Sequence, residues 1–265
     1  ALIGRLRNDT KLERAAWEKA LELWPANPRV PYLMGRKLSR KYRFAEGAAL
    51  QRQALQFDHR YVPAKAQLAQ DLLRLGEEEE GWRLAEEVHE QDGYDVTALN
   101  LVTLRDALAD FRTLTNDHFV VRLAPHEAAL YGSRALEVLE QARLKLGAKY
   151  GFKETAPVKV EVFAQQSDFA VRTFGMPENH GFLGVCFGQV ITANSPAARP
   201  GRAFNWEAML WHEFCHVVTL QLTRNRMPRW LSEGLSVYEE RQANSAWGER
   251  MVPRYREMIL GGELT

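Results

Sequence analysis

The sequence predicts two parts of different fold class, an all-α solenoid over residues 1–113 and an α+β domain over residues 114–265. Three observations support this prediction. The first hundred residues repeat with a period of 34, short apolar runs punctuated by glycine follow, and two histidines at helical spacing lie near residue 214. A chain of 265 residues is long enough for two domains of ordinary size.

The composition is ordinary for a globular protein. Hydrophobic residues make up 46% and charged residues 26% of the chain, and the net charge is +1. The net charge therefore creates no overall electrostatic field that would favour binding of nucleic acid. No apolar run approaches the roughly 20 residues of a membrane span. Ala1 is followed by no hydrophobic leader, and the last residues, 260–265, are typical of a cut within a longer protein.

Residues 34 positions apart share their character in the first hundred residues. The equivalent sets are Ala20, Ala54 and Val88; Met34, Leu68 and Val102; and Tyr42 with Gly76 at the turn between two helices. A helix–turn–helix unit of this length resembles the tetratricopeptide repeat (TPR). The segments 28–61 and 62–95 are predicted as full repeats, flanked by single helices at 10–24 and 95–108.

Such repeats bury their apolar faces only against their neighbours, so a stable array usually needs about three or more. A stacked array presents a concave groove that can bind a peptide or a partner protein. The other interpretation is a spacer or packing platform for the second domain, and both stay open.

Beyond residues 110–116 the repeat pattern stops and short strands are predicted. Residues 158–163 alternate apolar and polar side chains, which is typical of a half-buried strand, and residues 118–123 predict another. The segment 181–193 contains two short apolar runs separated by glycines, which predicts a hairpin. Two free, buried thiols are expected at Cys186 and Cys215, with a single bridge between them as the alternative.

Four helices are predicted between and after these strands. Residues 125–150 have apolar side chains at helical spacing, with Pro125 in the first turn and Gly151 at the end. Shorter helices are expected over residues 167–174, from about 205 to 222, and from about 232 onward. Because strands precede the last two helices, we expect these helices to pack on one face of the sheet.

The most informative feature is an H-E-x-x-H sequence in the helix after residue 205. His212 and His216 lie about 40° apart around an α-helix and about one turn along it, so both imidazoles can bind one ion. Glu213 lies just off that face, where it can act as a general base towards water. One buried histidine is more often a core residue, but this combination favours a metal site.

A catalytic zinc site uses three protein ligands and one open position. Glu233 is the best candidate for the third ligand, because the 16 residues after His216 allow the helix to end, turn and return antiparallel. Gly234, directly after it, lets the second helix approach the first closely.

His212-Glu213-Phe214-Cys215-His216, followed by Pro-Arg-Trp-Leu-Ser-Glu-Gly-Leu-Ser-Val-Tyr over residues 228–238, resembles the gluzincin metallopeptidases. The similarity covers about residues 118–242 and is greatest to the bacterial peptidase MA-like group, in which a zincin domain often follows helical repeats. The resemblance implies a zincin-like zinc metallopeptidase domain over residues 114–265. It also implies a bacterial hydrolase, with the periplasm or cell envelope as compartment.

Carried over residue by residue, the resemblance implies that His212, His216 and Glu233 bind Zn²⁺. Glu213 would be the general base and would then deliver the proton to the leaving amine. Gluzincins also hold the substrate backbone on an edge strand, for which the glycine-rich segment 184–192 is the candidate. An ordinary hairpin in the sheet is the other interpretation of that segment.

The sequence departs from the family at two places. Many gluzincins have an aspartate four residues after the glutamate ligand to orient a ligand histidine. Val237 stands there, and the candidates to replace it are Ser236, Glu239 and, preferred, Glu240. A donor to the oxyanion is also required, and the candidates for it are His180, Tyr238 and Tyr255.

The resemblance therefore implies a zinc-dependent peptidase acting on a peptide or protein substrate. The departures motivate an alternative, a catalytically weak or inactive zincin-fold scaffold that binds metal or peptide. A third hypothesis is a zinc hydrolase of another amide, such as a cell-wall peptide.

Overall fold

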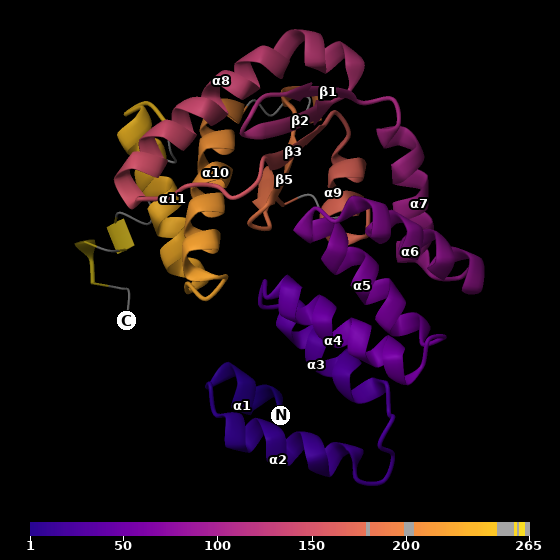
Figure 1. Cartoon of the computed structure of the whole chain (residues 1–265). Helices are drawn as coiled ribbons and strands as arrows, with labels where there is room; N and C mark the ends of the chain where they lie inside the picture. The colour runs from indigo at the N-terminus through magenta and orange to yellow at the C-terminus, as the bar shows by residue number, and fades with distance from the viewer. Residues whose placement is uncertain (179–180, 199–203, 248–256, 259, 263–265) are drawn as a thin grey trace.

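The chain is mostly helical and contains one small mixed sheet of five strands (Figure 1). The computed structural model describes residues 1–178, 181–198, 204–247, 257–258 and 260–262. The predicted combination of helices with a small sheet is confirmed, and the finer division into a repeat solenoid and a zincin-like domain stays a prediction. Among the described residues, no helix is both long and apolar enough to cross a membrane.

The amino-terminal half consists of helices stacked in chain order. They are α1 (Leu2–Leu6), α2 (Thr10–Leu21), α3 (Arg29–Ser39), α4 (Phe44–Phe57), α5 (Val62–Leu75), α6 (Glu78–Gln91) and α7 (Val96–Leu108). Helices α3 and α4 pack as one pair and α5 and α6 as the next. The starts of α4 and α6 are 34 residues apart, which is the period of the sequence.

The turns inside the two helical pairs have the same backbone conformation at equivalent positions. Tyr42 has φ 62° and Gly76 has φ 83°, both in the left-handed region. Glycine adopts this conformation freely, whereas a residue with a side chain adopts it at a cost of about 1–2 kcal/mol. Tyr42 is thus a strained residue in a position that the next pair fills with glycine.

The sheet has the strand order β1-β2-β3-β5-β4. Its strands are β1 (Arg112–Thr115), β2 (Phe119–Leu123), β3 (Val158–Phe163), β4 (Gly184–Cys186) and β5 (Val190–Asn194). The central pairs are parallel and the two outer pairs are antiparallel. The expectation that strands begin at residue 118 was wrong, because β1 precedes β2. Three of the four residues of β1 are exposed, so it lacks the apolar alternation that marks a strand.

The remaining helices cover both faces of the sheet. They are α8 (Pro125–Tyr150), α9 (Gln166–Phe174), α10 (Trp206–Thr223) and α11 (Arg229–Ala243). Helices α8 and α10 share a buried core with one face, which includes Val160, Ile191 and Phe214, and α11 packs on α10. The last helix begins three residues earlier than expected, because Pro228 precedes its first turn and leaves Arg229 free to be helical.

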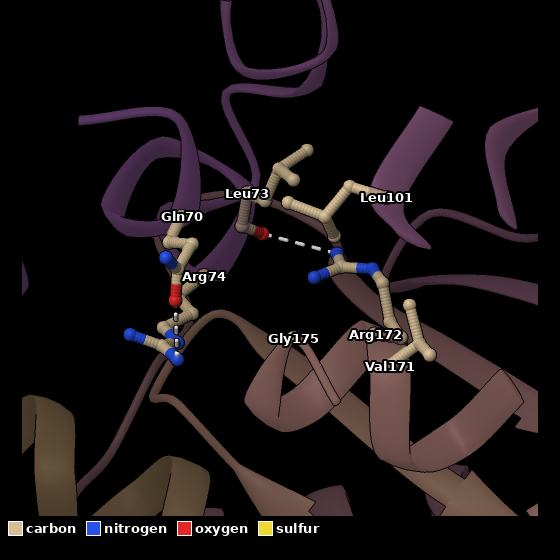
Figure 2. Close-up of a pocket in the computed structure, with 7 residues that line it drawn as sticks. All are labelled: Gln70, Leu73, Arg74, Leu101, Val171, Arg172 and Gly175. Atoms are coloured by element: carbon tan, nitrogen blue, oxygen red, sulfur yellow. Dashed lines mark hydrogen bonds between the residues drawn. The ribbon is translucent and has the colours of Figure 1, made fainter. Parts of the chain in front are cut away.

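The other face of the sheet meets α9 and the amino-terminal helices in one apolar core. Phe163 and Phe187 lie in the same buried cluster as Phe44 and Leu73. Arg172 on α9 forms an ion pair with Glu161 at 2.7 Å. It also donates a hydrogen bond to the carbonyl of Leu73 at 3.0 Å, which Figure 2 shows. The helical half is therefore packed against the sheet, and their relative position is fixed by buried contacts.

Candidate metal centre

Helix α10 carries the site on a buried and rigid element. The Asn205 side chain caps it by accepting a hydrogen bond from the Ala208 amide at 3.0 Å, and Arg224 ends it with φ 52°. Eleven of its residues are buried, because it lies between the sheet and α11. A helix buried on most sides holds its side chains in one arrangement.

Three ligand atoms from α10 and α11 form a compact triangle. The Nε2 atoms of His212 and His216 are 3.0 Å apart, and each lies 3.3 Å from Oε2 of Glu233. Tetrahedral zinc with ligand bonds of about 2.0–2.1 Å separates its ligand atoms by roughly 3.3 Å. The three residues therefore form a cluster that could hold a metal ion, and their donor atoms fit the size of a zinc site.

Both histidines are oriented through their second ring nitrogen. Nδ1 of His212 contacts the carboxylate of Glu240, and Nδ1 of His216 lies 2.8 Å from the Ser232 hydroxyl. The Ser232 hydroxyl is in turn 3.0 Å from that of Thr219. Such outer partners direct Nε2 towards the ion and set the tautomer. Glu240, the preferred candidate to replace the missing aspartate, thus contacts a ligand histidine. Ser232 and Thr219 were not predicted from the sequence, since isolated hydroxyl residues form no pattern.

The charges of the site favour a cation. Burial lowers the pKa of His212, but its contacts with Glu233 and Glu240 outweigh burial and raise that pKa to about 10. The contacts of Glu233 with His212 and His216 hold the pKa of the Glu233 carboxylate far below its usual range. The carboxylates of Glu213, Glu233 and Glu240 surround two imidazoles, and a divalent ion bound between them would balance part of their charge.

Glu213 is buried beside this cluster with one carboxylate oxygen unused. It is only 5% exposed, and within the described part of the chain its Oε2 has no hydrogen-bond partner. Burial raises its pKa, although the nearby His216 and His212 act in the opposite direction. Gly184 lies directly against it, since a Cβ there would be 2.8 Å from Oε1. A carboxylate in this state is suited to accept a proton.

The other residues predicted for the site are placed as follows. Tyr238 is half exposed, and Lys149 Nζ lies 4.8 Å from its ring centroid. Glu239 is buried and pairs with the same lysine at 2.6 Å. His180 and Tyr255 lie outside the described residues. Both cysteines are free and buried, and burial raises the pKa of the Cys215 thiol to about 12, so it stays protonated at neutral pH.

Comparisons of this chain with protein-family models, with curated proteins and with solved structures returned no match. A function therefore has to be inferred from the chemistry of the cluster and its surroundings.

Proposed function

We propose that this protein is a zinc-dependent peptidase of gluzincin type, which hydrolyses peptide bonds with Glu213 as general base. The observation that carries the proposal is the unpartnered, buried Oε2 of Glu213 next to the triangle of His212, His216 and Glu233. Two imidazoles and a carboxylate form a ligand set that suits zinc. When bound, the metal would polarise the scissile carbonyl and make a water molecule acidic enough to react near neutral pH.

The chain's own residues then have distinct roles. Glu213 accepts the proton of the attacking water and transfers it to the leaving amine, which its raised pKa favours. Glu240 and Ser232 hold the two imidazoles so that both Nε2 atoms face one point. The helical half would bind the substrate or a partner protein.

Strand β4 supports the choice of an extended peptide as substrate. It lies at the end of the strand order, so among the described strands it pairs only with β5. Its Gly184 is in contact with Glu213. A peptide that adds to this edge by backbone hydrogen bonds would thereby lie along the general base.

The test is metal analysis followed by a screen with a fluorogenic peptide library. We expect about one zinc per chain and metal-dependent cleavage. The Glu213→Gln variant should keep its zinc but lose about 10²–10⁴ in rate, as expected when a general base is removed. Glu207→Gln, on the same helix but paired with Arg134, is the matched control and should retain activity. Absence of zinc, or a fully active Glu213→Gln variant, would refute the mechanism.

A second candidate is a metal-binding scaffold without hydrolytic activity. It is favoured by one observation: Tyr238, the candidate donor to the oxyanion that the structure describes, is half exposed, and its ring lies 4.8 Å from Lys149 Nζ on α8, so this contact is with α8 and not with the metal cluster. Robust zinc-dependent cleavage in the same screen would exclude it.

A further inference from the structure

We infer that Glu239 is a positioning residue of the metal centre: its carboxylate ties α11 to the last turn of α8 and thereby fixes where Glu233 and Glu240 meet the histidines of α10. The inference rests on the proposed function, because it concerns the ligands of the same metal. It assigns a task to a buried carboxylate whose hydrogen bonds run to α8 and not to the cluster.

The buried face of α11 is polar. Its buried residues are Ser232, Ser236, Glu239 and Glu240, so no apolar side chain of this helix is among them. Most helices of globular proteins are instead held by an apolar stripe, whose packing is non-directional. Hydrogen bonds require definite distances and angles. The position of α11 therefore depends on what these four side chains bond.

Three of these four side chains, those of the two serines and Glu240, contact Nδ1 of His212 or His216. Such contacts can orient the imidazoles only if α11 is itself held in place from another side. Glu239 is the buried residue of α11 that provides this link, because its partners lie on α8.

The carboxylate of Glu239 bonds two neighbouring residues at the end of α8. Its Oε1 accepts hydrogen bonds from Lys149 Nζ at 2.6 Å and from Tyr150 Oη at 2.5 Å. Glu239 is 3% exposed, so water competes little for these donors. Because hydrogen bonds to an ionised group are shorter and stronger than neutral ones, this pair of bonds is suited to hold one helix against another.

The end of α8 is a firm support for α11. Figure 1 shows α11 beside that end of α8, where the two bonds are made. Leu139 and Leu146 of α8 are buried in the apolar core that α8 shares with the sheet and α10. The last turn of α8 is therefore fixed relative to the sheet, and Glu239 gives α11 a fixed position relative to the same core.

The link to α8 reaches the metal ligands through the helix itself. Glu239 and Glu240 are consecutive, so their side chains leave α11 about 100° apart, one towards α8 and the other towards α10. A shift of α11 away from α8 would move Glu240 together with Glu233, which lies about two turns earlier on nearly the same face. Functional groups must be held to within about 0.5 Å, so such a shift would disturb the bound metal.

The test compares Glu239→Gln with Glu78→Gln, a matched control in the helical half. Both substitutions neutralise a carboxylate that bonds two donors on other elements, which for Glu78 are Arg122 and Lys159. Cobalt(II) is bound in place of zinc, because its visible absorption bands report the coordination geometry. We expect the bands of Glu239→Gln to differ in position and intensity from those of the wild type. The bands of Glu78→Gln should be unchanged.

The cobalt bands decide the question, since a merely structural contact would not alter them. Unchanged bands in Glu239→Gln would overturn the inference, whatever the change in thermal stability. Turnover of the zinc-loaded full chain gives a second readout. The kcat of Glu239→Gln on the best library peptide should fall about 10–100-fold, because displaced ligands misplace the reacting groups. Glu78→Gln should retain wild-type kcat.

Tyr150→Phe keeps the inference falsifiable if Glu239→Gln does not fold. It removes one of the two bonds and keeps the ring, so the cobalt bands should change in the same direction by a smaller amount. Tyr61→Phe, whose ring packs within the helical half, is its control. Unchanged bands in folded Tyr150→Phe would overturn the inference while the peptidase proposal stood. If the wild type binds neither zinc nor cobalt, the proposed function itself fails.

Discussion

The helical half and the α10–α11 pair bury polar groups in very different ways. Among the described residues of the helical half, the buried polar side chains are Ser39, Gln51 and Asp71. In α10 and α11 they are Glu213, His216, Thr219, Ser232, Ser236, Glu239 and Glu240. Both regions are helices packed on helices, so packing does not require this difference. The larger number of buried titratable groups therefore supports α10 and α11 as the candidate site.

The two regions also differ in how their buried acids are compensated. Asp71 is a single carboxylate, which accepts hydrogen bonds from Ser39 at 2.7 Å and from Gln67 at 2.9 Å. Burial raises its pKa to about 6, against the lowering effect of those bonds and of Arg74, whose guanidinium lies 4.0 Å from the carboxylate. In the site, Glu233 and Glu240 instead contact His212, and a bound cation would complete the balance. Burial of the Asp71 carboxylate thus costs stability at neutral pH, whereas the cluster on α10 and α11 could hold a metal ion.

The substitution with the largest expected effect tests the metal cluster on α10 and α11. The His216→Ala variant should lose more than about 100-fold in zinc affinity, because it removes a direct ligand where even an outer partner accounts for about 10–100-fold. Competition with a chromophoric chelator measures the dissociation constant. His59→Ala, an exposed histidine of the helical half, is the control. Equal affinities of the two variants would remove the basis for a metal centre here.

Substitution of Glu240 by glutamine sharpens the same comparison by testing orientation instead of ligation. Glutamine still accepts a hydrogen bond from Nδ1 of His212 but carries no charge, so zinc affinity should fall by about 10–100-fold without being lost. The same competition assay applies, with the exposed Glu137→Gln on α8 as control. Wild-type affinity in Glu240→Gln would show that this contact does not act on the metal ligand.

The substitution with the smallest expected effect tests the helical half, at Asp71. Its folded-state pKa of about 6 is above the usual value of 3.8, so the folded state binds the proton more tightly than the unfolded state. The stability this provides is complete below about pH 4 and is lost as the pH rises through 6. The Asp71→Asn variant should therefore be about 2–3 kcal/mol more stable than wild type at pH 8, with little difference at pH 4.

Urea unfolding of the metal-free protein at both pH values measures this difference. Chelator should be present throughout, so that metal binding does not contribute to the free energy of unfolding. A variant less stable than wild type at pH 8 would show that the Asp71 carboxylate, in its charged form, is required by the helical packing.

Local sequence patterns were sufficient to predict most of the helices and strands. The period of 34 located α3 to α6, and apolar spacing with Pro125 located α8 with its bounds. Spacing also brought Glu233 and Glu240 to one helix face, since they lie seven residues, about two turns, apart. Strand β1 was missed because its side chains are exposed, and a strand of this kind is defined only by its partner.

The sequence by itself determined which residues can form a metal centre on two helices, because helical periodicity is local and converts spacing into a shared face. Only the tertiary structure decided what surrounds that centre. The contact of Gly184 with Glu213 and the packing of Tyr42 on Phe187 join segments far apart in the chain. Contacts of this kind depend on how the helical half packs on the sheet, and that packing cannot be predicted from the periodicity of the sequence.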